Sequence, residues 1–327
     1  MQRRTLLAAG GGLLASPLAT TLATPAFAQA KYPDRPIRFL IPWPPGGALD
    51  ALHRQMFEIV HKDLGQPVLI ENRPGARGTQ AALFLINQAR PDGYTLAHHH
   101  LSILRHPFLT KARTWDPVAD FTYIMQLSGF LFGTAVRADS PWKTFAELMA
   151  AAKAEPGKYS YSTSGIATTN HLAMEDILER ERAEMLHIPY RGSPEGVTAL
   201  LGRQIHCVAD SASWLPNVEA GELRLLSVWK RERLRAVPQA PTLMDLGYNM
   251  VVTSPYGIVG PKGVEPEIVD VLHRAFKKAM EDEASQAIIN RWEMPREYLP
   301  PAEYLAFARE RTEYERTTVA RRGLSID

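Results

Sequence analysis

The sequence predicts an α/β protein with two domains, and three features of the chain support this prediction. Its 327 residues exceed the usual size of one compact domain. Short apolar segments alternate with stretches of helical apolar spacing, an order that predicts parallel strands joined by crossover helices. Glycine-rich or hydroxyl-rich loops follow several predicted strands, and open α/β sheets bind ligands at that edge.

The first 30 residues carry the pattern of an export signal. Arg3 and Arg4 precede an apolar region, and Ala26-Phe27-Ala28 gives the small-x-small pattern that signal peptidase reads. Glycines and a proline interrupt the apolar region, which argues against a membrane anchor. The paired arginines resemble a twin-arginine (Tat) signal, and an ordinary Sec signal is the alternative. We expect cleavage near residues 28–30 and a periplasmic mature chain.

Charge and cysteine content restrict the class of protein. The chain has 37 Lys and Arg against 35 Asp and Glu, and removal of the signal leaves 35 of each. A nucleic-acid-binding protein usually concentrates a basic excess in one region, so we expect no nucleic-acid partner. The single cysteine, Cys207, cannot form an internal disulfide and is predicted to be buried in an apolar strand.

The first predicted domain starts with an apolar strand from Ile37 that stops at Pro42. In the following loop, Gly46 and Gly47 allow a close approach of the backbone to a bound group. The N–H groups and dipole of the next helix favour an anion, so the loop is interpreted as a carboxylate or phosphate cradle, with a ligand-free connection as the alternative. The elements that follow are predicted as helix 48–64, strand 68–70, helix 80–89 capped by Thr79, and strand 94–98.

The second predicted domain repeats the pattern of polar loops ahead of helices. An apolar stretch at 123–136 is predicted to be extended and to carry the chain into this domain, after an irregular segment at 101–119. We expect the first domain to comprise residues 31–124 and 251–327, and the second residues 125–250. Helices are predicted at 143–154, 171–180, 194–201, 266–280, 283–292 and 302–316, and strands at 159–162, 185–188, 205–209, 225–229 and 256–259.

Several motifs resemble one family of receptors. The segment Pro42-Trp43-Pro44-Pro45-Gly46-Gly47-Ala48-Leu49-Asp50 is similar to the Pro-Phe-Pro-Pro-Gly-Gly-x-x-Asp loop of the Bug-type (TctC-like) extracytoplasmic solute receptors of tripartite tricarboxylate transport systems. Other stretches resemble the family in the same order over nearly the whole mature chain. They are 64–68, 71–76, 91–96, 164–165 with 171–173, 187–193 and 220–224.

The resemblance implies a two-domain periplasmic binding protein of type II (Venus-flytrap) form, whose domains close around a small organic carboxylate. It implies a monomeric receptor that is not an enzyme, needs no cofactor and delivers its ligand to the membrane components of a tripartite tricarboxylate-type transporter. Matching motifs place ligand-facing positions in 43–48, 75–79 and 164–169. The complete set of expected ligand-binding residues is Trp43, Pro44, Gly46, Gly47, Ala48, Arg77, Gly78, Thr79, His99, His100, Ser102, Ser164, Gly165, Thr168, Thr169 and Asp210.

Departures from the family pattern bear on the ligand. Arg77 stands at a position that is usually glycine, the histidines at 98–100 replace small and hydroxyl residues, and His206 stands where aspartate is frequent. We expect Arg77 and the histidines to favour a ligand with a second charged or strongly polar group, and the affinity to rise as the pH falls through the histidine range. Trp43 is interpreted either as a ligand-stacking residue or as a plug of its loop.

The run of histidines also raises the question of a metal site. In an extended chain His98 and His100 share a face while His99 points away, and no spaced motif elsewhere supplies a third ligand. We therefore expect no metal. Hydrogen bonding to a ligand and ordinary packing at the strand end are the alternatives for these residues.

An exported hydrolase acting on a small ester or amide is the alternative function. Ser162, Ser164 and His171 supply the residue types of such a site. However, the chain lacks a Gly-x-Ser-x-Gly elbow, and helix capping is a sufficient explanation for the hydroxyl cluster.

Overall fold

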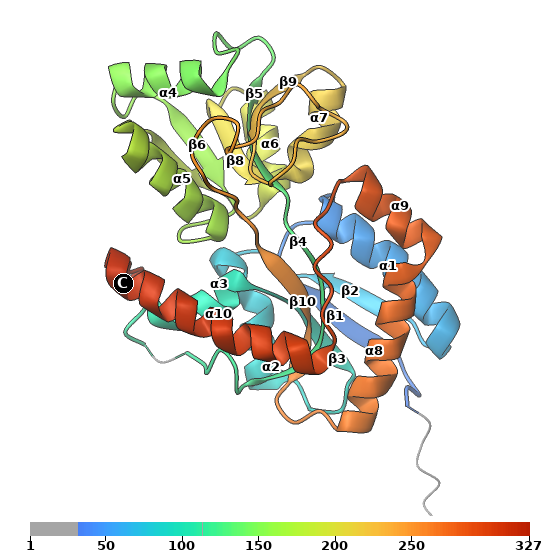
Figure 1. Ribbon diagram of the computed structural model, residues 1–327. Coiled ribbons are helices and arrows are strands. Elements are labelled where there is room, and N and C mark those ends of the chain that lie inside the picture. Colours follow the sequence, from blue (N-terminus) through green and yellow to red (C-terminus); the bar gives the residue numbers. More distant parts are fainter. Residues whose placement is uncertain (1–31, 113) are drawn as a thin grey trace, which may run out of the picture. The chain divides into compact units, whose positions relative to one another are not determined.

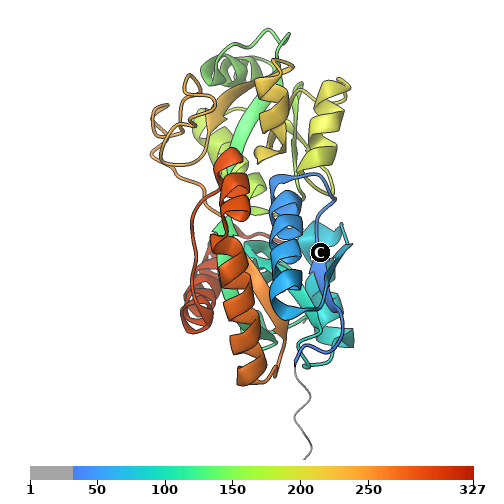
Figure 2. The same cartoon turned by 90° about the vertical axis from the view of Figure 1, so that its right-hand side faces the viewer.

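The computed structural model describes residues 32–112 and 114–327, and the predicted export signal lies outside this part of the chain. Residues 33–327 form one compact unit that contains two five-stranded sheets. Figures 1 and 2 show that blue, cyan and red elements gather around one sheet and green and yellow elements around the other. The predicted α/β architecture is confirmed. None of the helices that the structure describes is long and apolar enough to cross a membrane.

The first sheet combines strands from both ends of the described chain. Its order is β2-β1-β3-β10-β4, with β1 parallel to β2 and β3, and β10 antiparallel to β3 and β4. The strands are β1 (Ile37–Ile41), β2 (Val68–Asn72), β3 (Thr95–His100), β4 (Phe121–Gly129) and β10 (Pro255–Pro261). Strand β10 therefore returns to the first sheet, as the apolar segment at 256–259 predicts.

Helices cover both faces of the first sheet. Helices α1 (Ala48–Leu64), α8 (Pro266–Glu281) and α9 (Glu283–Arg291) contact one another, and α1 lies beside α8 in Figure 2. Helices α2 (Gln80–Gln88), α3 (Leu101–Arg105) and α10 (Pro301–Arg322) contribute to a separate apolar cluster. Helix α1 ends where the sequence predicts, because Gly65 adopts the left-handed φ of 72° that glycine accepts readily.

The second sheet is built from one continuous part of the chain. Its order is β7-β6-β8-β5-β9, and its strands are β5 (Phe132–Arg137), β6 (Ser160–Thr163), β7 (Leu186–Pro189), β8 (Cys207–Ser211) and β9 (Leu223–Val228). Helices α4 (Phe145–Ala154), α5 (Thr169–Glu181), α6 (Ser193–Leu201) and α7 (Leu215–Glu219) connect them. We call the part of the molecule around the first sheet lobe 1 and the part around the second sheet lobe 2.

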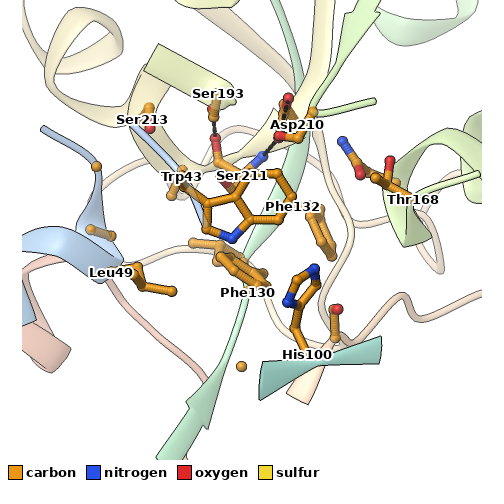
Figure 3. A pocket seen from close by; sticks show the side chains of 18 of the residues that line it. Trp43, Leu49, His100, Phe130, Phe132, Thr168, Ser193, Asp210, Ser211 and Ser213 are labelled. Atoms are coloured by element: carbon orange, nitrogen blue, oxygen red, sulfur yellow. Dashed lines mark hydrogen bonds between the residues drawn. The ribbon is translucent and has the colours of Figure 1, made fainter. Parts of the chain in front are cut away.

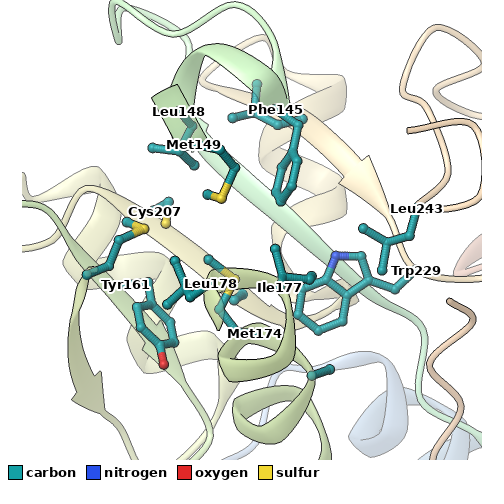
Figure 4. Close-up of a cluster of buried hydrophobic side chains, with 14 of the residues drawn as sticks. Phe145, Leu148, Met149, Tyr161, Met174, Ile177, Leu178, Cys207, Trp229 and Leu243 are labelled. Carbon is teal, nitrogen blue, oxygen red and sulfur yellow. The ribbon is translucent and has the colours of Figure 1, made fainter. Parts of the chain in front are cut away.

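The core of lobe 2 contains a large apolar cluster, shown in Figure 4. Phe145, Tyr161 and Trp229 are among its largest fully buried side chains. Cys207 is 0% exposed within the same cluster, which confirms its predicted burial, and burial raises the pKa of its thiol to about 12. The thiol is therefore a packing group at physiological pH.

The chain passes between the lobes at Phe130 and Leu131. The predicted single extended stretch at 123–136 is in fact two strands, β4 and β5, in different sheets. All of β4 up to Gly129, which pairs with Pro255, belongs to the first sheet, so the expected domain limit at 124 falls within a strand. The sequence does not mark this break, because both strands are mostly buried and the residues between them, Phe130 and Leu131, are apolar like many of their neighbours.

Some boundaries differ from the prediction near the ligand loops. Strand β3 continues to His100 because His98 and His100 pair with Ile258 and Tyr256 of β10. Part of the segment predicted as irregular at 101–119 forms helix α3 and a 3₁₀ turn, His106–Phe108. Thr79 precedes α2, but its hydroxyl donates to the Ala76 carbonyl (2.7 Å) instead of capping the helix.

Candidate functional site

A pocket lies between lobe 1 and lobe 2 and is lined by residues of both (Figure 3). The empty space at the pocket amounts to about 760 Å³, which includes space open to solvent. Lobe 1 contributes the loop after β1 and the residues after β3, and lobe 2 contributes the loops after β6 and β8. Loops that follow strands of both sheets thus meet at the pocket, and open α/β sheets bind ligands at the carboxyl ends of their strands.

The loop after β1 is held in place by side chains behind it. Asn72 Nδ2 donates to the Trp43 carbonyl (2.9 Å), and the Gly46 N–H donates to Asp50 Oδ2 (3.2 Å). Arg54 Nε donates to the same carboxylate oxygen (2.9 Å). Although burial alone would raise the pKa of Asp50, hydrogen bonds from Arg54 and Gly46 lower it. Gly46 therefore serves the internal structure of the loop and does not line the pocket, in contrast to our expectation.

Helices α1, α5 and α6 begin at the pocket. Gly47 is the N-cap of α1, Thr168 that of α5 and Gly192 that of α6, and none of them makes a side-chain capping hydrogen bond. The first turns of an α-helix have backbone N–H groups without intrahelical partners and carry a partial positive charge. Backbone donors of three helices are thus directed towards one pocket. The lining residues from these helix starts are Gly47, Ala48, Leu49, Asp50, Thr168, Thr169, Asn170, Ser193 and Pro194.

Asp210 is the second acidic residue of the pocket and is 1% exposed. The Ser164 hydroxyl lies within hydrogen-bonding distance of both carboxyl oxygens (2.7 and 2.8 Å), and the Ser211 N–H donates to Oδ1 (2.6 Å). Burial raises the pKa of Asp210 to about 7 in spite of these hydrogen bonds. Near neutral pH this carboxyl therefore exists in both charge states.

The three histidines of β3 lie on two faces of the strand. His100 lines the pocket, whereas His99 points to the opposite face, where its Nδ1 lies 3.1 Å from the Tyr304 hydroxyl. Our placement of His99 at the ligand is therefore wrong, because side chains alternate along a strand. Burial lowers the pKa of both His99 and His100 to about 3. These rings stay neutral at physiological pH, so the expected rise in affinity through the histidine range does not follow from them.

The loop Gly75–Gly78 carries its side chains away from the pocket. All four residues have positive φ, and Ala76 (45°) and Arg77 (60°) adopt this conformation without being glycine. Arg77 packs instead against Gly165 and lines a separate hollow that also includes Arg191. Burial lowers the pKa of Arg77. Of the expected ligand residues, Arg77, Gly78, Thr79 and Gly165 therefore lie outside the main pocket.

Most of the remaining expected residues do meet in the pocket: Trp43, Pro44, Gly47, Ala48, His100, Ser102, Ser164, Thr168, Thr169 and Asp210. Sequence reasoning missed several others. The rule that ligands meet strand-end loops points to Ser193 and Ser211, but no sequence signal indicates Phe130, Trp292 or Met294. The missed lining residues are Leu49, Asp50, Gly129, Phe130, Leu131, Phe132, Asn170, Ser193, Pro194, Ser211, Ala212, Ser213, Ser254, Trp292 and Met294.

Ser164 in the pocket is not paired with a histidine, and the serine–histidine contact of lobe 2, between Ser160 and His206 Nδ1 (3.0 Å), lies outside the pocket. The Ser164 hydroxyl is bonded to Asp210, and His171 Nδ1 accepts from the Ala167 N–H (3.2 Å). Nucleophilic catalysis requires a base that accepts the serine proton, and His171 is occupied elsewhere. Within residues 32–112 and 114–327, no group of three or more His, Cys, Asp or Glu side chains is arranged to hold a metal ion.

Two α/β lobes with a pocket lined from both, at the starts of helices, define the class of two-lobed solute-binding proteins. Residues 52–324 match the model of the tripartite tricarboxylate transporter family receptor (TctC), and the chain belongs to this family. The resemblance of the sequence motifs to Bug-type receptors is thereby confirmed.

Individual relatives and structures agree with this assignment. The chain is 44% identical over 326 residues to the UPF0065 protein in the gbd 5' region of Cupriavidus necator, with 99% of each chain covered. It is 30% identical over 270 residues to Protein BugT of Bordetella pertussis, covering 80% of this chain and 81% of the relative.

Solved structures of similar fold include one described as a periplasmic transporter, with a TM-score of 0.85, 29% identity, and 90% of this chain and 100% of the other covered. The periplasmic binding protein BugD matches with a TM-score of 0.83 and 25% identity, covering 90% of this chain and 99% of BugD. The Venus-flytrap fold that the motifs imply is confirmed.

Proposed function

We propose that this chain is a periplasmic receptor that captures a small organic carboxylate in the pocket between its lobes. The observation that carries the proposal is the convergence of the starts of α1, α5 and α6 on one pocket, with no side-chain cap on any of the three helices. Backbone N–H groups and helix dipoles at such positions bind anions without a cationic side chain. The residues that line this pocket include no lysine or arginine.

The other parts of the proposal rest on family membership and on the sequence. The chain acts as a monomer that passes its ligand to the membrane components of a tripartite tricarboxylate-type transporter. It reaches the periplasm through cleavage near residues 28–30, by the Sec or Tat route. It catalyses no reaction, and the bond between Ser164 and Asp210 supports this, because it leaves the serine without a histidine base. Two structures of similar fold were determined with malate and with adipate.

A single substitution in the loop after β1 tests how the anion is held. In Gly47→Asp, the new carboxylate would occupy the N-cap of α1, where aspartate stabilises a helix but repels an anionic ligand. Gly47→Asn is the matched control, because asparagine is nearly the same size and carries no charge. An added Cβ at residue 47 would lie 3.3 Å from the rotatable Ser213 hydroxyl, and both variants share this contact.

Calorimetry and thermal shift with citrate, malate, adipate and benzoate measure the result. We expect at least one of these acids to bind the native protein, and Gly47→Asp to bind it about tenfold or more weakly than Gly47→Asn. If none of the acids binds, or if the protein consumes a small ester, the receptor proposal is wrong. If the two variants bind the acid equally, the helix starts do not hold the carboxylate.

A further inference from the structure

Two hydrogen-bonding side chains of lobe 1 line the pocket without a hydrogen bond of normal geometry, although the His100 ring also interacts with the backbone of Arg77. Neither the indole Nε1 of Trp43 nor the ring nitrogens of His100 makes a hydrogen bond of normal geometry with any described residue, and all three atoms are buried. Both residues line the pocket, and their ring centroids lie 5.1 Å apart. Figure 3 shows the two rings next to each other on the same side of the pocket.

Unpaired buried donors of this kind are costly to a protein. A polar group removed from water without a replacement partner typically costs about 1–3 kcal/mol. His100 is 3% exposed, and its ring is neutral at physiological pH because burial lowers its pKa to about 3. A neutral imidazole carries one N–H donor, and the indole of Trp43 is a donor only. The Trp43 N–H therefore has no acceptor, and the His100 ring has only its interaction with the Arg77 backbone, so an acceptor atom inside the pocket would serve both rings.

Aromatic and aliphatic side chains surround this donor pair. The ring of Phe130 lies 6.5 Å from that of Trp43 at 86°, and Phe132 stacks on Phe130 at 6.0 Å with an interplanar angle of 29°. Trp292 and Met294 complete the apolar lining. Such walls favour a flat apolar body over a chain of hydrated polar groups.

The charges near the donor pair decide what kind of acceptor it suits. No lysine or arginine lines the pocket, and the two arginines next to it already have carboxylate partners: Arg54 is bonded to Asp50, and Arg105, whose charge acts on His100, is paired with Glu315. A second carboxylate buried beside Trp43 and His100 would find neither of these cations free to offset its desolvation cost. A neutral oxygen, such as a carbonyl, ether or phenolic oxygen, needs only the two N–H donors.

We propose that Trp43 and His100 form a donor subsite that selects carboxylates with a planar apolar body bearing a neutral oxygen acceptor. This inference rests on the proposed function, since the carboxylate itself is held at the helix starts. It replaces our sequence-based expectation that Arg77 selects a second charged group, because Arg77 lies outside this pocket.

A matched pair of ligands tests the subsite with the native protein. Formylbenzoate and methylbenzoate, each as the meta and para isomer, have nearly the same shape, but only the formyl group offers an acceptor oxygen. Of the two formyl isomers, we expect the one that binds better to bind about tenfold more tightly than the methyl acid substituted at the same ring position. A factor of about ten corresponds to one well-formed buried hydrogen bond. Adipate and terephthalate, which carry a second carboxylate, are expected to bind more weakly than formylbenzoate.

Two variants assign the effect to the donor pair. Trp43→Phe keeps an aromatic ring and removes the N–H, so it should abolish most of the preference for the formyl over the methyl acid. Trp142→Phe removes an indole N–H in the core of lobe 2, outside the pocket, and should keep the preference. Circular dichroism melting checks that both variants fold, and the comparison in the native protein stands without them.

The outcomes separate this inference from the receptor proposal. Equal affinities for the formyl and methyl acids in the native protein, or a preference that survives Trp43→Phe, would overturn the donor subsite while leaving a carboxylate receptor in place. Tighter binding of adipate or terephthalate than of formylbenzoate would also overturn it. If no carboxylate of the whole series binds, both proposals are wrong.

Discussion

A buried ion pair between Arg105 of α3 and Glu315 of α10 offers the sharpest test of the structure. Arg105 Nε lies 2.6 Å from Glu315 Oε2, and the two side chains are 3% and 1% exposed. Glu315 also accepts from Arg311 (2.8 Å). On the other side, Arg105 Nη1 donates to the Ala167 carbonyl of lobe 2 (2.7 Å), one residue before the pocket-lining Thr168.

Glu315→Gln removes the negative charge and retains nearly the same volume. The Arg105 guanidinium would then remain buried with only neutral acceptors, and breaking a buried pair from one side costs about 3–5 kcal/mol. Equilibrium urea denaturation should show this loss as a lower midpoint with an unchanged slope. Because Arg105 holds the loop before α5, ligand affinity should fall as well.

The same helix supplies a control. Glu313 forms an exposed ion pair with Arg316 (2.6 Å), and Glu313→Gln should leave the midpoint unchanged, because solvent screens such pairs. If Glu315→Gln and Glu313→Gln have equal midpoints, then the Arg105–Glu315 pair is not buried in solution and our account of the contact between α10 and lobe 2 is wrong.

Three further predictions concern the pocket and the lobes. Gly78→Ala should weaken ligand binding and lower the stability by about 1–3 kcal/mol, because a Cβ at this φ of 82° would lie 2.7 Å from both His100 Nε2 and Trp43. The control is Gly65→Ala, where no atom lies within 4 Å of the added Cβ, and calorimetry should show native affinity for this variant. Burial raises the pKa of Asp210 to about 7, and its ionised form repels an anion, so ligand affinity should rise as the pH falls through this pKa. At pH values above the pKa, the affinity should change by up to about tenfold per pH unit. A pH dependence of the affinity that persists in Asp210→Asn would contradict this prediction. Small-angle scattering should show a smaller radius of gyration with a saturating ligand, and an unchanged profile would exclude closure of the lobes.

The sequence was most informative about site residues whose positions follow from the order of strands and helices. Loops after parallel strands lie at one edge of their own sheet, which places Trp43 at the edge of the first sheet and Ser164 and Thr168 at the edge of the second. The family resemblance implied that both edges face one cleft, and the pocket includes all three residues. The alternation of side chains along an extended strand also separated His99 from His100, although we still expected both at the ligand.

Other parts of the site depend on contacts that a local pattern does not encode. Phe130 lies in the apolar run Phe130-Leu131-Phe132, and nothing in the sequence distinguishes it from these neighbours. Trp292 and Met294 reach the pocket from the end of α9, far along the chain from the other lining residues. The direction of Arg77 is set by four consecutive residues with positive φ, two of which are not glycine. The charge states of His100 and Asp210 follow from burial, which only the folded structure defines.

The position of β10 between β3 and β4 has a consequence for the order in which the protein assembles. The strands of lobe 2 follow one another without interruption from Phe132 to Val228, so this sheet can pair as soon as that part of the chain is available. The first sheet cannot be completed until Pro255–Pro261 arrives, and the Arg105–Glu315 pair joins residues 210 positions apart. Closing such long loops is slow. A chain interrupted before Pro255 would therefore carry the complete sheet of lobe 2 beside an incomplete sheet of lobe 1, and proteases that cleave unfolded segments would cut first among the residues of lobe 1 that precede Phe130.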